Sequence, residues 1–188
     1  MTIEEVFKQI GTHMIEGLMM HSQMSEYYLF LGLEGYAECH QYHYFEESWS
    51  FQDLILYYIK EFNKLLPISQ AKDPGVISQN WYKYARNDVD AGTRKTAIKT
   101  GMEKWIDWEK ETKMLYENMY KELLNAGEVA AAHKVKELVL DVDEELRQAE
   151  QYYLDKKITD YDMAVILEEQ KSKKDKYEID KRSLFFHK

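Results

Sequence analysis

The sequence has little cysteine, proline and glycine: one Cys, two Pro and eight Gly in 188 residues. The single Cys39 excludes a framework of internal disulfides and is typical of a reducing compartment, so we expect a cytoplasmic protein. Few Pro and Gly favour long helices over many loops. The sequence lacks an apolar run of the roughly 20 residues that a membrane-spanning helix needs, and its acidic, amphipathic start is unlike a secretory signal.

An excess of basic residues is also missing, since the formal net charge is -9. The longest basic cluster, Lys171 to Lys176, is interrupted by Ser172 and Asp175. This distribution argues against nucleic acid as a partner, because binding phosphates requires a basic stripe. With 45% hydrophobic residues, the chain is suited to one folded domain over residues 1–188.

Apolar residues recur at helical spacing over most of the chain and predict an all-α fold. A helix should start at Ile3, because Thr2 and Glu5 have the spacing of a capping box. Pro67 should end the second helix. We expect four long helices and a shorter fifth, with a turn in HQYHYFE between the first two; their ranges are about 3–40, 47–66, 91–125, 128–156 and 160–177.

Four glycines interrupt the first of these helices, at Gly11, Gly17, Gly32 and Gly35, and each costs about 1 kcal/mol of helix stability against Ala. They either allow a neighbouring helix to approach closely or mark a kink near Gly32 to Gly35. The sequence favours close approach.

The connection from Pro67 to Asp90 is long for a bundle with short loops. It contains the turn signal Asp73-Pro74-Gly75. The segment from Gln79 to Arg86 is long enough to form a short helix. A connection of this length is typical of a bundle in which one crossover spans the full length of the helices.

The segment from Gln23 to Tyr36, QMSEYYLFLGLEGY, resembles the first helix of bacterial ferritins. With the long crossover, this resemblance implies a ferritin-like four-helix bundle with up-down-down-up topology. The crossover would lie between helices 2 and 3, and a short helix would follow at the C-terminus. The resemblance also implies a homo-oligomer, of which we favour a homodimer; the partner itself is not identified by the sequence.

Members of this superfamily hold two metal ions with two Glu residues and two Glu-x-x-His motifs, because residues three apart share one helix face. No Glu in this sequence is followed three residues later by His. The resemblance places Gln23 at the first-helix Glu and Glu61-Phe62-Asn63-Lys64 at the second-helix motif, where a lysine would repel a cation. A standard di-iron site is therefore not expected.

Some ligand types nevertheless lie on inward faces. We take His21, Glu61, Glu109 and Glu145 as candidate metal ligands, with iron or manganese as the ion if the altered site binds one; otherwise no cofactor is expected. His40 and His43, together with Glu38, are a second candidate group, although histidines near a solvated helix end would give the same pattern.

Three functions follow. The first is a non-catalytic ferritin-like bundle that acts through self-assembly or partner binding, and no catalytic residue is assigned. The second is a metal-binding oxidoreductase or storage protein with an altered di-metal site. The third is a bundle that binds a small molecule in a pocket of aromatic residues, which include Trp105 and Trp108.

Overall fold

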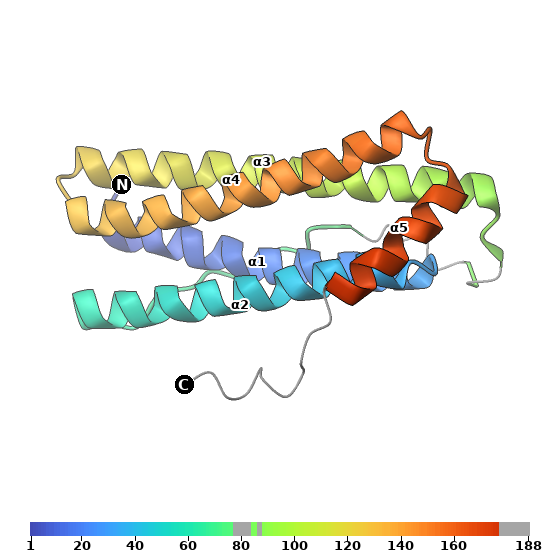
Figure 1. Ribbon diagram of the computed structural model, residues 1–188. Coiled ribbons are helices and arrows are strands. Elements are labelled where there is room, and N and C mark those ends of the chain that lie inside the picture. The colour runs from blue at the N-terminus through green and yellow to red at the C-terminus, as the bar shows by residue number, and fades with distance from the viewer. Residues whose placement is uncertain (77–83, 86–87, 177–188) are drawn as a thin grey trace.

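The computed structural model describes residues 1–76, 84–85 and 88–176 of the chain. Within these residues it contains helices and no strand, and the helices are α1 (Ile3–Phe30), α2 (Glu34–Phe62), α3 (Ala91–Asn125), α4 (Val129–Ile158) and α5 (Met163–Lys176). The first four lie side by side, and α1 and α4 run opposite to α2 and α3 (Figure 1). The predicted up-down-down-up bundle with a short fifth helix is confirmed.

The start of α1 follows from its sequence. The Glu5 backbone N–H donates to Thr2 Oγ1 over 3.2 Å, and the Thr2 N–H donates to Glu5 Oε2 over 2.8 Å, which is the predicted capping box. Its end was predicted wrongly, at about residue 40. The helix stops at Phe30, because Gly32 takes a positive φ of 79° and Leu33 donates its N–H back to Tyr28.

The predicted turn at residues 40–46 is also wrong, since these residues lie inside α2. They show no single apolar face because α2 packs against both α1 and α5. Close approach, the favoured interpretation of the glycines, holds at Gly35, where a Cβ would overlap the carbonyl group of Gln170 in α5. Gly32 instead ends α1. It lies in the stretch from Gly32 to Gly35 for which the sequence offered a kink as the alternative interpretation.

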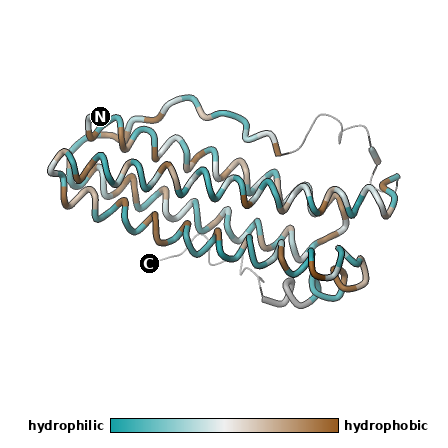
Figure 2. The backbone as a smooth tube through the Cα atoms, turned by 90° about the horizontal axis from the view of Figure 1, so that it is seen from above, coloured by the Kyte–Doolittle hydropathy of each residue, from teal (hydrophilic) through white to brown (hydrophobic). Residues whose placement is uncertain are grey.

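The crossover leaves α2 at Asn63, ahead of Pro67, and reaches α3 at Asp90, whose carboxylate caps the N-terminus of that helix. Its described part up to Val76 runs beside the helices in Figure 2. Side chains of α1 accept hydrogen bonds from its backbone N–H groups: Ser69 to Thr12 over 2.9 Å, Lys72 to Glu16 over 2.8 Å and Val76 to Gln23 over 3.1 Å. The α1 surface therefore guides the crossover along the bundle.

Two sequence predictions fall largely or wholly outside the described residues, namely the short helix at 79–86 and the apolar end at 184–186. Among the helices that are described, none combines the length and apolar character that crossing a membrane demands.

The bundle interior consists of two apolar cores. The first core contains Phe7, Met14, Leu54, Tyr116 and Val142, among others. The second core contains Met20, Cys39, Trp105, Ala149 and Ile166, among others. On α2, α3 and α4 the stretch between the two cores contains His43, Glu47, Glu109, Thr112 and Glu145, and on α1 His21 follows Met20 at the edge of the second core. We call these six residues the polar layer.

Candidate metal centre

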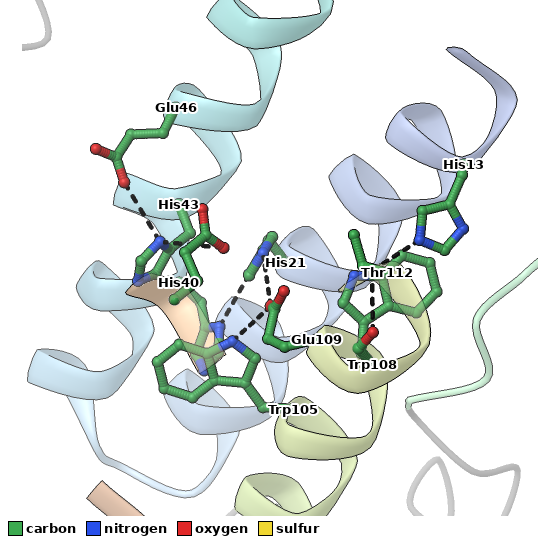
Figure 3. A network of polar contacts seen from close by, with 10 residues as sticks. His13, His21, His40, His43, Glu46, Trp105, Trp108, Glu109 and Thr112 are labelled. Carbon is green, nitrogen blue, oxygen red and sulfur yellow. Dashed lines mark hydrogen bonds and ion pairs between the residues drawn. The ribbon is translucent and has the colours of Figure 1, made fainter. Parts of the chain in front are cut away.

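Each of the four long helices contributes at least one ionisable side chain to the polar layer. His21 of α1, Glu47 of α2, Glu109 of α3 and Glu145 of α4 line one internal cavity of about 30 Å³. A space of this size holds a single water-sized guest. Figure 3 shows part of this layer, where His21 and Glu109 point toward each other from different helices.

The inner part of the layer is formed by His21, Glu109 and Glu145, whose ligand atoms all lie within 4.8 Å of one another. His21 Nε2 lies 3.9 Å from Glu109 Oε1, and both side chains are almost fully buried. This distance is too long for a hydrogen bond. It falls between the separations expected of two atoms bound to one ion, because Zn–N and Zn–O bonds of about 2.0–2.2 Å place tetrahedral ligands about 3.4 Å apart and opposite ligands about 4.2 Å apart.

A second group, formed by His43, Glu46 and Glu145, lies next to the first. His43 Nδ1 is 3.3 Å from Glu46 Oε2 and 3.9 Å from Glu145 Oε2. Since Glu145 belongs to both groups, its carboxylate stands between two positions at which a cation would find three ligands.

An open groove of about 570 Å³ between α2 and α4 meets both groups. Its lining includes Tyr42, His43, Glu46, Asp141, Glu144 and Glu145. Ser50, Asp141 and Glu145 line both the groove and the internal cavity. The groove therefore connects the polar layer with solvent, along a surface rich in carboxylates.

The carboxyl groups of the layer are hard to ionise without a cation. Burial, followed by the nearby Glu145 and Glu47, raises the pKa of Glu109 well above its ordinary value. Burial also raises the pKa of Glu145, and it raises that of Glu47 to about 8. Neither Lys nor Arg is among the described residues that line the cavity. The positive charge that these carboxylates need must therefore come from protons or from a bound ion.

The histidines of the layer differ from each other. Burial lowers the pKa of His21 well below its ordinary value, with His43 and His40 adding to the effect, so His21 is neutral and keeps a lone pair for a metal. Burial alone would lower the pKa of His43, but Cys39, Glu46 and Glu145 around its ring raise it well above the ordinary value.

Neighbouring side chains hold the layer in place. The indole N–H of Trp105 donates to Glu109 Oε1 over 2.8 Å, one helical turn away. On the other side, the His13 ring stacks on Trp108 with 4.6 Å between the ring centroids. The Thr112 hydroxyl donates to the Trp108 carbonyl, so it accepts from His13 Nε2, which is 2.7 Å away. Such outer contacts orient the side chains that face an ion.

One buried polar atom at the cavity needs a hydrogen-bond partner that a bound ion and its water would supply. The Tyr116 hydroxyl is buried and has no hydrogen-bond partner among the described residues, although Tyr116 lines the cavity. A metal-bound water would satisfy it. Together with the ligand types present, this observation indicates that the layer fits a divalent transition-metal ion.

The structure brings together three of the four predicted ligands, His21, Glu109 and Glu145. It places Glu61 elsewhere, exposed in the last turn of α2, while Lys64 is exposed and faces Glu4 at 3.8 Å. Gln23 is also outside the layer, where it hydrogen-bonds Asp73 and Val76 of the crossover. Gln23 and Glu61–Lys64 therefore lie outside the polar layer, and their match to the family ligand positions stays a prediction.

Sequence reasoning missed Glu47 and Ser50, which both line the cavity. They stand three residues apart in α2, with the spacing of Glu-x-x-His but with Ser in place of His. A search for Glu-x-x-His that tolerated another residue at the last position would have found them. The predicted turn at residues 40–46 hid them, and it also suggested a solvated helix end for His40 and His43, which are in fact buried within α2.

The fold and the polar layer define a class: four long helices, a crossover along their full length, and buried carboxylates and imidazole between two apolar cores. The sequence matches no protein-family profile and no curated protein.

Two solved structures share the fold. One is an engineered closed form of the Archaeoglobus fulgidus ferritin, with a TM-score of 0.73 and 12% identity; the match covers 92% of this chain and 96% of that one. The other is a variant of PmFTN soaked in iron, with a TM-score of 0.71 and 10% identity, over 89% and 95% of the two chains. The chain thus has a ferritin-like four-helix bundle fold, and at this level of identity the likeness concerns the fold alone.

Proposed function

We propose that this protein binds divalent transition-metal ions, iron or manganese, within the polar layer of its bundle. His21, Glu47, Glu109 and Glu145 would hold an inner ion, and His43 and Glu46 would share Glu145 to hold a second. In this role the ion supplies Lewis acidity and, for iron or manganese, a redox couple. The chain's own residues bind it, shield it between two apolar cores and admit it through the acidic groove.

The observation that carries this proposal is the clustering of His21, Glu109 and Glu145 at the centre of the bundle. Burying charge is costly unless the charge is paired or coordinates a metal. The layer places three carboxylates against each other, each with a raised pKa, where an apolar layer of the same volume would be more stable. Groups perturbed in this way, close to a cavity, are typical of functional sites.

The test is metal binding by the whole protein after purification without chelators or an affinity tag. Elemental analysis and titration calorimetry with Mn²⁺, and with Fe²⁺ under argon, should show one to two ions per chain. The substitution Glu109→Gln should weaken binding at least about tenfold, which is about 1.4 kcal/mol. Glu61→Gln is the matched control, because Glu61 was predicted from the sequence and lies outside the layer.

A protein that binds neither ion, or two variants that lose affinity equally, would contradict the proposal. The first result favours the other function indicated by the sequence, a non-catalytic bundle that acts through self-assembly or partner binding. Ser50 in place of a histidine ligand is the observation in favour of that alternative.

Self-assembly is a separate part of the proposal. We infer a homo-oligomer, with a dimer as the smallest form, and light scattering of the eluting protein checks it. Exposed apolar side chains on α2 support this inference, since Leu56 is 53% and Trp49 is 38% exposed.

A further inference from the structure

We propose that His40 is a positioning residue for His21: it accepts the Nδ1 proton of His21, so that the Nε2 lone pair of His21 faces Glu109. The inference rests on the proposed function. It gives His40, which belongs to neither of the two clusters around Glu145, a role different from the ligand role that the sequence suggested for it.

The two imidazole rings meet nitrogen to nitrogen. His21 Nδ1 and His40 Nδ1 are 3.1 Å apart, and both side chains are buried. A hydrogen bond between two ring nitrogens needs an N–H on one and a lone pair on the other. One of two arrangements must therefore hold: His21 donates to His40, or His40 donates to His21. Both carry the same charge and differ only in which nitrogen bears the proton.

These arrangements have opposite consequences at the other edge of the His21 ring. If His40 donates, a neutral His21 carries its proton on Nε2 and points an N–H at Glu109. That proton would have no hydrogen-bond acceptor in Glu109, because the nearest oxygen is 3.9 Å away. If His21 donates, Nε2 is a bare lone pair, which is the form that binds a metal. Only the second arrangement makes His21 a ligand.

Packing fixes His40 in the orientation that this role requires. Its ring stacks on Tyr28 with 5.4 Å between centroids and 13° between planes, and it meets the edge of Trp105 at 4.6 Å. Trp105 in turn donates to Glu109. His40, His21, Glu109 and Trp105 thus form a closed ring of contacts (Figure 3), so His40 and the metal-facing carboxylate are held by the same indole.

A ligating histidine almost always donates its second ring N–H to an acceptor, and removal of that acceptor costs about 10- to 100-fold in metal affinity. The test compares His40→Phe, which fills the space and removes the acceptor, with His40→Asn, whose side-chain carbonyl replaces the Nδ1 lone pair. Two readouts are used: ¹⁵N NMR of the His21 ring in the metal-free protein, and calorimetric titration with Zn²⁺, which has no redox chemistry.

In the metal-free wild type and in His40→Asn, His21 should carry its proton on Nδ1. In His40→Phe, the NMR signals should show a shift toward the Nε2-protonated form, and Zn²⁺ affinity should fall about 10- to 100-fold. His40→Asn should recover the affinity to within about threefold of wild type, a recovery that a purely structural role for the His40 ring would not give.

A proton on Nε2 of His21 in the metal-free wild type, or a His21 tautomer unchanged in His40→Phe, would overturn the inference. Failure of the proposed function looks different, because the wild type would then bind no Zn²⁺, Mn²⁺ or Fe²⁺ while the tautomer of its His21 could still be read.

Discussion

The two apolar cores and the polar layer between them are built by the same four helices and follow opposite physical rules. In the cores, side chains such as Phe7, Leu54 and Ile98 are completely buried and stabilise the fold through the area that they remove from water. In the layer, Glu47, Glu109 and Glu145 are carboxylates whose burial opposes ionisation. The bundle is therefore stable because of the cores and in spite of the layer, and such a layer is typical of a functional site.

The largest effect is expected from a change in the first core. Leu54→Ala should lower the free energy of unfolding by about 2–5 kcal/mol, because it removes buried methyl groups and leaves a cavity. Urea denaturation of the metal-free protein measures the loss. Gln52→Ala, on the exposed side of the same helix, should change stability by no more than about 0.5 kcal/mol. Equal losses in the two variants would mean that the cores do not provide the stability.

A smaller effect, and one of opposite sign, is expected in the layer from Ser50→His. The substitution gives α2 the Glu-x-x-His spacing with Glu47, beside the shared wall of the groove and the cavity. Affinity for Zn²⁺ should rise about tenfold or more, because an imidazole adds a further protein ligand. Titration calorimetry measures it, with Ser48→His as the control on another face of α2. If both histidines raise the affinity alike, the gain is not due to the layer.

The sequence predicts much of this comparison, because periodic apolar residues report burial whatever they pack against. The capping box at Thr2, the third helix over residues 91–125 and the long crossover were all indicated correctly. The boundary between the first two helices was not. Leu31, Gly32 and Leu33 resemble helical residues in composition, and the break there depends on the backbone conformation of Gly32, which a pattern of apolar residues does not reveal.

The site is predicted less completely, for a physical reason. The spacing of apolar residues shows which face of a helix points inward, and His21, Glu109 and Glu145 were each found in this way on their own helix. The register between helices is set by packing, which spacing does not show. Glu61 was chosen on α2, but Glu47, which lies 14 residues earlier on the same helix, is the acidic residue that lines the cavity.

The smallest effect concerns the pH dependence of stability. Burial raises the pKa of Glu47 from its ordinary value of 4.5 to about 8. Between these two values the folded protein binds more protons than the unfolded chain, so the stability of the metal-free protein should fall as pH rises from about 5 to about 8. Glu47→Gln removes this contribution and should make the unfolding free energy depend less steeply on pH.

Urea titrations at a series of pH values, in the presence of a chelator, measure this slope. Glu61→Gln should keep the wild-type slope, since Glu61 is exposed at the end of α2. The effect is the smallest of the series because Glu47 is partly exposed and solvent screens its charge.

Added Zn²⁺ should reverse the slope in the wild type, because ligands must lose protons to bind a metal and binding strengthens as pH rises. If Zn²⁺ left the wild-type slope unchanged, the raised pKa of Glu47 would affect folding without being coupled to metal binding. The layer would then need an explanation other than metal binding.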